Sequence, residues 1–257
     1  NTSQSQYGYG VATAGTFKTL VDGCTFANTR HGFTTTSRSY QWDSNTTTSE
    51  YLGGGRDQSG MVVNCYGDGG YGGSAPFDTH MCAQDTTFNN CVVDGAESGF
   101  HIRGRNVTVS NCKTFNVNNY GIYAFTEYVG TSNSGDAWAN DKNHMSSVRI
   151  NNCELNAFGT PLYMRALTSC DITDVVANAG SVQVMLVAGC KVNLHGRNTF
   201  AVSDFHGTRP IDSSSNEGMI TVTGSNSLAS YLDPGIFVSP GSNLRLDGTD
   251  RKSTRLN

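Results

Sequence analysis

A cysteine returns at the end of the same short phrase along the first 153 residues of the chain. The phrase combines a short apolar strand with a turn that contains Asn or Gly. Its five copies are Leu20–Cys24, Val62–Cys65, Thr87–Cys91, Thr108–Cys112 and Arg149–Cys153. Successive cysteines are 41, 26, 21 and 41 residues apart, and the longer separations carry Gly-, Ser- and Thr-rich insertions. A period near twenty residues without helical periodicity predicts a solenoid of parallel strands.

The composition supports this prediction and excludes two classes of partner. The chain has 30 glycines and only 15% charged residues, which favours many tight turns over long helices, whose interiors disfavour Gly and Asn. A net charge of −4 gives no basic footprint for nucleic acid or for an anionic membrane surface. No apolar run approaches the roughly 18–20 residues that a membrane helix needs. We therefore expect no nucleic-acid partner and no membrane insertion.

The repeat pattern divides the chain into three parts. Residues 1–207 are predicted to form a parallel β-helix that begins inside a circuit, so we expect it to be truncated at its N-terminus. The period weakens over 208–249, which we interpret as the last circuits or the start of a C-terminal β module. The basic segment 250–257 resembles the translation of a common sequencing-library adapter, and we expect it to carry no function.

The cysteines are expected to be reduced. There are eight, an even number that often indicates disulfides in a secreted chain. Equivalent positions on stacked circuits point the same way, however, and a buried free cysteine behaves as a small apolar side chain. The sequence has no CxxC pair and no clustered His–Cys spacing, so it predicts no metal site. No cofactor is expected either.

A second repeated strand follows the cysteines when the copies are aligned on them. The aligned segments are Phe77–His80, Phe100–Arg103, Ile122–Phe125 and Leu162–Arg165, with Gln183 in a later equivalent. Because side chains alternate between the faces of a strand, the apolar first and third positions are predicted to point inward. The second and fourth positions then share one outer face, in the order Asp78 and His80, His101 and Arg103, Tyr123 and Phe125, Tyr163 and Arg165. An earlier Gly32-Phe33 pair aligns with this strand and places His31 at the leading edge of the same face.

Insertions around this strand are expected to wall a groove. They cover Thr35–Gly60, Gly67–Pro76 and Thr126–Ser147. Loops of this length within a compact fold are usually functional or disordered, and their Trp42 and Trp138 would offer flat apolar faces to sugar rings. Ordinary surface loops are the alternative interpretation. The predicted substrate-binding residues are His31, Tyr123, Tyr163, Arg165, Glu97, Asp94, Trp138 and Trp42.

The predicted catalytic residues are Asp78, His80, His101 and Arg103. In glycoside hydrolysis, one carboxylic acid protonates the leaving oxygen while a second carboxylate activates water or attacks the sugar. Asp78 would be one of the two, and Asp94, Glu97 or a loop residue such as Asp136 would be the other.

In β-elimination of a uronic acid, a base removes the ring proton next to the carboxylate. His80 or His101 would be that base, and Arg103 or Arg165 would hold the carboxylate through two hydrogen bonds. The patch carries one firm carboxylate with two histidines and two arginines, which favours elimination or binding of an acidic polymer. A merely polar surface is the alternative to both reactions.

The Arg30–Gly32, Phe77–His80 and Gly99–Arg103 phrases, interleaved with Asn-Cys turns, resemble those of phage and prophage tail proteins of the pectin-lyase-like class. The resemblance covers residues 7–204. It implies an all-β fold, a right-handed single-stranded parallel β-helix (solenoid) with long loop insertions walling one sheet. It also implies a homotrimer on the virion that binds or cleaves bacterial surface polysaccharide. The motifs of polygalacturonases and the acidic calcium ligands of pectate lyases are absent, so those activities are not expected.

Three functions remain open because this fold alone does not determine a reaction. The first is a polysaccharide hydrolase or lyase of a phage tail. The second is a non-catalytic receptor-binding or structural tail segment that holds a glycan on the same patch. The third is a secreted bacterial polysaccharide lyase or hydrolase. A deep groove around a tight Asp78–His80–Arg103 cluster would favour an enzyme, and a shallow open sheet would favour binding.

Overall fold

The computed structural model describes residues 8–35, 57–69, 74–80, 83–125, 147–165, 169–178, 181–185, 191–196, 198–202, 204–208, 219–223, 227–230, 237–238 and 243–247. Every regular element in these ranges is a β-strand. In the same ranges, no helix has the length and the hydrophobicity to cross a membrane.

The strands of the described ranges form three parallel sheets and one short pair. Sheet 1 contains β1 (Tyr9–Thr13), β4 (His31–Thr35), β8 (Phe77–Thr79), β12 (Ser98–Ile102), β15 (Tyr120–Phe125), β18 (Thr160–Arg165), β21 (Ser181–Met185), β24 (Asp204–Thr208) and β27 (Phe237–Val238). Sheet 2 contains β2 (Leu20–Asp22), β6 (Met61–Val63), β10 (Thr87–Asn89), β13 (Val107–Ser110), β16 (Ser147–Asn151), β19 (Ser169–Thr173), β22 (Lys191–His195), β25 (Met219–Thr223) and β28 (Asn243–Asp247). Sheet 3 contains β3 (Thr25–Thr29), β7 (Tyr66–Gly69), β11 (Val92–Asp94), β14 (Lys113–Val117), β17 (Glu154–Ala157), β20 (Val176–Asn178), β23 (Thr199–Val202) and β26 (Ser227–Ser230). The short pair is β5 (Asp57–Gln58) with β9 (Ala83–Gln84).

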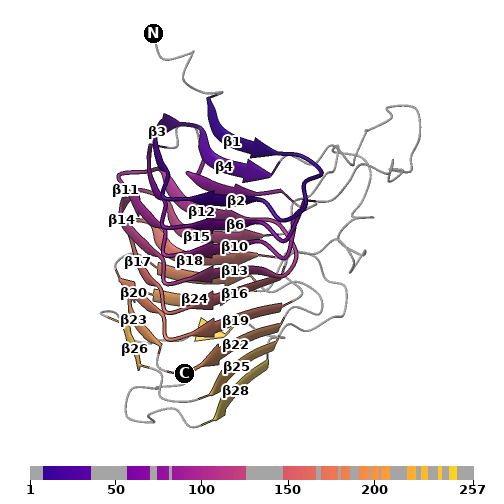
Figure 1. Ribbon diagram of the computed structural model, residues 1–257. Coiled ribbons are helices and arrows are strands. Elements are labelled where there is room, and N and C mark those ends of the chain that lie inside the picture. Colours follow the sequence, from indigo (N-terminus) through magenta and orange to yellow (C-terminus); the bar gives the residue numbers. More distant parts are fainter. Residues whose placement is uncertain are drawn as a thin grey trace, which may run out of the picture.

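The chain passes through sheet 2, sheet 3 and sheet 1 in turn, once in each circuit. Each strand pairs in parallel with the equivalent strand of the next circuit, as β10 does with β13 and β12 with β15. Figure 1 shows the circuits stacked from the N-terminal to the C-terminal end, with β25, β26 and β28 continuing the same columns. This is the parallel-strand solenoid that the cysteine period predicts.

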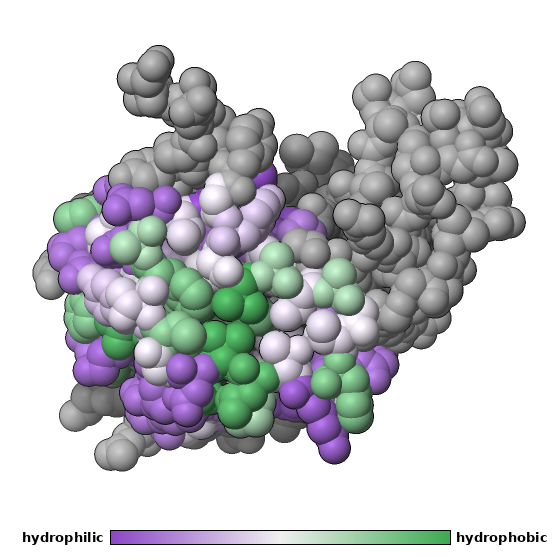
Figure 2. Space-filling model, turned by 45° about the horizontal axis from the view of Figure 1, so that its top comes forward, coloured by the Kyte–Doolittle hydropathy of each residue, from purple (hydrophilic) through white to green (hydrophobic). Residues whose placement is uncertain are grey.

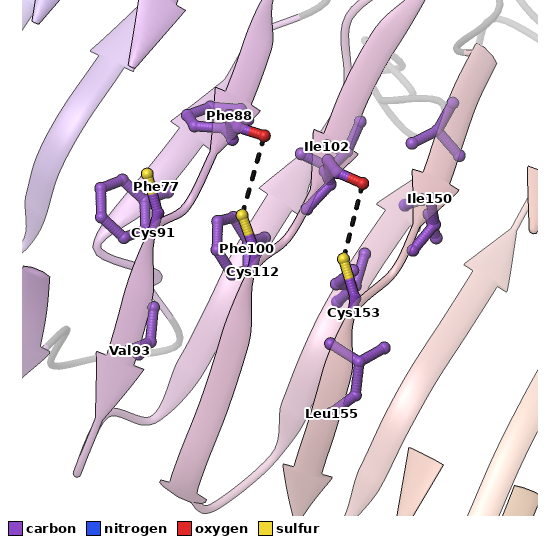
Figure 3. Close-up of a cluster of buried hydrophobic side chains, with 14 of the residues drawn as sticks. Phe77, Phe88, Cys91, Val93, Phe100, Ile102, Cys112, Ile150, Cys153 and Leu155 are labelled. Atoms are coloured by element: carbon purple, nitrogen blue, oxygen red, sulfur yellow. Dashed lines mark hydrogen bonds between the residues drawn. The ribbon is translucent and has the colours of Figure 1, made fainter. Parts of the chain in front are cut away.

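Four of the five repeated cysteines line the interior of the solenoid, and Figure 3 shows Cys91, Cys112 and Cys153 beside the phenylalanine rings. The first, Cys24, is only partly buried and packs against this core. Cys65, Cys91, Cys112 and Cys153 are at most 2% exposed, and each is a free thiol. The thiol of Cys112 donates a hydrogen bond to the carbonyl of Phe88 in the preceding circuit, at 3.7 Å. Burial raises the pKa of the Cys65 thiol to about 11. These thiols therefore fill the core as small apolar groups, as predicted.

Asparagines make the turn between sheet 2 and sheet 3. Asn64, Asn90, Asn111 and Asn152 all have φ between 49° and 54°, the left-handed region that Asn tolerates better than most residues. Their side chains also hydrogen-bond from circuit to circuit: Asn152 Nδ2 donates to Asn111 Oδ1 at 2.7 Å, and Asn111 Nδ2 donates to Asn89 Oδ1 at 2.7 Å. The turn before each cysteine is thus fixed by backbone conformation and by this side-chain ladder.

The turn predicts different costs for two substitutions at Asn111. Asn111→Ala is expected to lower the free energy of unfolding by about 1–3 kcal/mol, because alanine at φ 54° is strained and cannot make the ladder bonds. Asn111→Gly loses the same hydrogen bonds without the Cβ strain, so it should cost less. Urea denaturation of both variants compares the two costs. Equal costs would show that the left-handed conformation contributes nothing.

Two successive residues face the interior at the corner where sheet 3 leads into sheet 1. A Cβ added to Gly32 would lie 2.5 Å from the ring of Phe26 in the core, and the next residue, Phe33, is 1% exposed. Strict alternation fails at this point. As a result, His31 before the pair and Thr34 after it both face outward. The same Gly-apolar pair recurs in β12 and β15, and proline takes the place of the glycine at Pro76 and Pro161.

Apolar surface gathers on the face shown in Figure 2, which brings the N-terminal end of the solenoid forward. Phe17 and Leu20, two of the most exposed large apolar side chains in the described ranges, belong to this first circuit at 66% and 63% exposure. Their circuit contains the strands at one edge of each large sheet, β1, β2 and β3.

Candidate functional site

The outer face of sheet 1 presents three rows of side chains that run across the circuits. Row 1 contains Tyr9, His31, Ser98, Tyr120 and Thr160. Row 2 contains Thr34, Asp78, His101, Tyr123 and Tyr163. Row 3 contains His80, Arg103 and Phe125, which directly follow or belong to the paired strands, and the backbone of Arg165 continues this row. The predicted register is confirmed: Asp78 pairs with His101, His101 with Tyr123, and Tyr123 with Tyr163.

The carboxylate of Asp78 is the centre of a buried polar cluster. Its side chain is 0% exposed, and Arg103 Nη2 donates to both of its oxygens at 2.6 Å. Thr34 Oγ1 donates to Asp78 Oδ2 at 2.7 Å. The guanidinium is held from behind as well, because Arg103 Nε donates to the carbonyl of Thr79 at 3.1 Å. We refer to His31, Thr34, Asp78, His80 and Arg103 as the Asp78 cluster.

The cluster keeps Asp78 ionised. Burial alone would raise the pKa of this carboxyl, because a charge is poorly solvated in the interior. The positive charge of Arg103 and the hydrogen bond from His80 outweigh burial and hold the pKa of Asp78 well below its usual range. A buried carboxylate in this state accepts hydrogen bonds and orients its neighbours, but it has no proton to give to a leaving group at neutral pH.

His80 is the member of the Asp78 cluster with the greatest access to solvent. Its side chain is 37% exposed, against 10% for Arg103 and 5% for His31. Its Nε2 lies 3.2 Å from Asp78 Oδ2 and 3.0 Å from Arg103 Nη2. This nitrogen donates to the carboxylate in one tautomer and accepts from the guanidinium in the other. An imidazole that a buried carboxylate orients, with one side open to solvent, has the geometry of a general base.

His31 closes the N-terminal side of the cluster. Its Nδ1 lies 2.8 Å from the carbonyl of Ala75, and because a carbonyl only accepts, this nitrogen carries the proton. Its Nε2 lies 3.9 Å from Asp78 Oδ2, and its ring stacks on Tyr9 with centroids 5.7 Å apart. Burial lowers the pKa of His31 despite the nearby carboxylate. The predicted position of His31 beside Asp78 is thus observed, with its side chain buried.

His101 lies next to Asp78 in row 2 and is 8% exposed. Its Nε2 is buried and has no hydrogen-bond partner among the described residues, and its ring makes edge contacts with Tyr123 and Phe125. Burial lowers the pKa of His101 to about 4. A neutral imidazole with an unused nitrogen is a weak base, but it can bind a polar ligand group that reaches it.

The low pKa of His101 predicts acid sensitivity. In the unfolded chain its pKa is about 6.5, so acidification from there to about pH 4 protonates the unfolded chain before the folded one. The free energy of unfolding should fall by about 3 kcal/mol over this window through His101 alone, in addition to any loss from His31. His101→Gln should reduce that fall, as measured by urea denaturation at several pH values. The same pH dependence with and without the imidazole would contradict the assignment.

Aromatic rings continue the outer face beyond the Asp78 cluster. Tyr123 stacks on Phe125 and on Tyr163, with centroids 4.0 and 4.9 Å apart, and Tyr120 stacks on Tyr163 at 5.4 Å. We refer to these four residues as the aromatic ladder; all are partly exposed. Since the rings use their faces to stack on one another, a ligand meets mainly ring edges and phenol hydroxyls. Phe125 joins the ladder to the cluster, because the Arg103 guanidinium lies 5.7 Å from its ring centroid.

The remaining predicted residues are placed less directly. Asp94 accepts a hydrogen bond from Asn116 at 2.7 Å, and Glu97 accepts one from Asn119 at 2.9 Å, so both brace the corner between sheets 3 and 1. For Arg165 only the backbone position in row 3 is described. Trp42, Trp138 and Asp136 lie outside the described residues.

Sequence reasoning did not select Thr34 or Tyr120 as site residues. Both positions follow from the corner geometry: Thr34 comes after a Gly-Phe pair and Tyr120 comes before a Gly-Ile pair. Strict alternation would place the residue before each such glycine in the interior. The Gly-apolar pair in the sequence was the signal that this residue instead lies on the outer face.

Comparisons with protein-family models, with curated proteins and with solved structures give no match to the chain. The resemblance to phage tail proteins therefore depends on the sequence phrases quoted above. Within the described residues, no three His, Cys, Asp or Glu side chains converge to hold a metal ion.

Proposed function

We propose that the protein is a right-handed parallel β-helix of the phage tail type that binds a bacterial surface polysaccharide along sheet 1 and cleaves it. On this proposal it acts on the virion as a homotrimer; a secreted bacterial enzyme is the alternative setting. The observation that carries the proposal is the contact between Asp78 and His80 beside the aromatic ladder. The imidazole of His80 is oriented by Asp78 and open to solvent. Beside it, the aromatic ladder presents hydroxyls and ring edges that repeat from one circuit to the next.

His80 is the general base in this proposal, and Asp78 is a positioning residue that acts through it. Two-carboxylate hydrolysis requires a protonated acid and a second carboxylate. In the described part of the cluster there is one carboxyl group, and it is buried and ionised. Elimination needs a base and no second carboxylate: His80 takes the proton beside the sugar carboxylate, a C=C bond forms as the C–O bond to the leaving sugar breaks, and the leaving oxygen takes a proton from solvent. The geometry therefore favours elimination.

A non-catalytic receptor-binding segment is the second candidate function. The observation that favours it is that Asp78 and Arg103 form their shortest hydrogen bonds with each other, so these groups are not directed at a substrate. A face of this kind can bind a glycan through the aromatic ladder without any bond being broken.

The test is incubation of residues 1–249 with a panel of bacterial capsular, lipopolysaccharide and teichoic-acid polymers. New reducing ends together with the ultraviolet absorbance of an unsaturated product indicate elimination, and reducing ends without it indicate hydrolysis. His80→Ala should lower the cleavage rate at least about a hundredfold, since a general base contributes that much or more. Binding without any product would instead support the receptor-binding function.

The matched control is His195→Ala. His195 is a partly exposed histidine on sheet 2 whose Nε2 lies 3.8 Å from the carboxylate of Asp171, so it repeats the His–Asp pairing away from sheet 1. The cleavage rate of this variant should equal that of the unmodified chain. A His80→Ala variant that keeps full activity would overturn the catalytic assignment.

A further inference from the structure

Arg30 carries a positive charge that no acidic side chain among the described residues offsets. It directly precedes His31 of row 1 and is partly exposed. Its Nε donates to Ser74 Oγ at 3.3 Å, and its Nη1 lies 3.5 Å from the hydroxyl of Tyr9. These neutral hydroxyls orient the guanidinium without neutralising it.

The acidic side chains near Arg30 in register have other partners. Among the described residues, Asp78 is paired with Arg103 at 2.6 Å. Glu97 occupies the register position of Arg30 two circuits further on, and it accepts a hydrogen bond from Asn119 at 2.9 Å. Asp68, at the adjoining corner, accepts a hydrogen bond from the backbone N–H of Asn28 at 3.2 Å.

Arg103 cannot supply the same recognition. Its Nη2 is committed to both oxygens of Asp78 and its Nε to the carbonyl of Thr79, and its side chain is 10% exposed. Binding a ligand anion there would require breaking a buried ion pair, which is costly. Arg30 forms no ion pair with any described residue, so a ligand anion can bind it without breaking one.

We propose that Arg30 binds an anionic substituent of the polysaccharide and that the site therefore selects acidic polymers. The planar guanidinium matches both a uronate carboxylate and a phosphodiester through paired hydrogen bonds. The proposal rests on glycan binding at sheet 1, but it does not depend on whether the bound polymer is cleaved.

The experiment measures binding by titration calorimetry with three probes of similar length: polygalacturonate, a poly(glycerol phosphate) teichoic acid and neutral dextran. We expect at least one of the two anionic polymers to bind and dextran to bind at least about tenfold more weakly. Arg30→Ala should weaken anionic binding about ten- to a hundredfold, the usual cost of a lost hydrogen bond to a charged group. Arg30→Lys should restore part of it, because lysine keeps the charge but not the paired geometry.

Arg149→Ala is the matched control. Arg149 is an exposed arginine on sheet 2 whose Nη1 also bonds a neutral group, the side-chain carbonyl of Asn106. Its removal should leave anionic binding unchanged. If Arg30 binds a carboxylate, Arg30→Ala should weaken the binding of polygalacturonate. If it binds a phosphodiester, the same substitution should weaken the binding of the teichoic acid.

The outcomes distinguish a failure of the Arg30 proposal from a failure of the proposed function. Dextran bound as tightly as the anionic polymers, or Arg30→Ala without effect, would overturn the role of Arg30 and leave glycan binding intact. Anionic binding that depends on Arg30 without product would support Arg30 and count against cleavage. No binding to any of the three probes would count against both.

Discussion

Replacing Asp78 with asparagine is expected to lower the free energy of unfolding by about 3–5 kcal/mol at neutral pH, the usual cost of breaking a buried ion pair. The loss is large because Arg103 would keep its buried charge without its carboxylate partner at 2.6 Å. Thr34 would also lose a charged acceptor at 2.7 Å. Urea denaturation, followed by circular dichroism, measures the change.

Two further variants make the test of Asp78 specific. Asp94→Asn changes a partly exposed carboxylate bonded to Asn116, and it should cost less than about 1.5 kcal/mol. The double variant Asp78→Leu with Arg103→Met removes both charges, and it should be more stable than Asp78→Asn alone. A double variant less stable than Asp78→Asn would contradict the expectation that the unpaired buried charge of Arg103 is the main cost of the single substitution.

The Asp78 pair also predicts a direction for the pH dependence. The folded pKa of Asp78 lies well below its usual range, so the unfolded chain binds the proton first as the pH falls. The stabilisation is fully present above about pH 4, the unfolded pKa, and is lost as the pH falls toward the folded pKa. Asp78→Asn should therefore flatten the stability curve below about pH 4.

Phe100→Ala is expected to cost about 3–5 kcal/mol, the usual loss for a fully buried phenylalanine. The Phe100 ring is 0% exposed, stacks on Phe77 with centroids 5.1 Å apart and meets the edge of Phe88 at 5.8 Å. Truncation leaves a cavity between two circuits, and the paired strands β8 and β12 restrict how far it can collapse (Figure 3).

Phe158→Ala is the control of the same residue type. Phe158 is 70% exposed, so its truncation should change the free energy of unfolding by no more than about 0.5 kcal/mol. Equal losses for the two variants would contradict the placement of Phe100 in the core.

Much of the fold and the register follows from the sequence because the solenoid repeats one short rule. Alignment on the cysteines and a two-residue period suffice to pair Asp78 with His101 and Tyr123 with Tyr163. The rule fails at the corner into sheet 1, where Gly32 and Phe33 both face inward. Because glycine has no side chain, the hydrophobic pattern of the sequence does not indicate whether a glycine faces the interior or the solvent.

The environment of the candidate site could not be predicted to the same extent. Sequence places Asp78, His101 and Arg103 on an outer face, yet in the structure each of these residues, backbone included, is at most 8% exposed. Whether an outward side chain is covered depends on its neighbours two residues away on the same strand and one circuit away on the paired strands. Thr34, His31 and the aromatic rings bury these side chains. Because they belong to other strands, the sequence of a single strand does not predict this burial.

The pairing register is indifferent to the length of chain between partners. Phe88 and Val109 are 21 residues apart and pair in sheet 2, and so do Val109 and Ile150, which are 41 apart. The pairing of the strands therefore stays the same whether the connecting segment between two circuits is short or long. In proteins of this architecture, the segments that connect the strands can lengthen or be exchanged without changes in core packing. The sequences of these segments can therefore change faster in evolution than those of the strands.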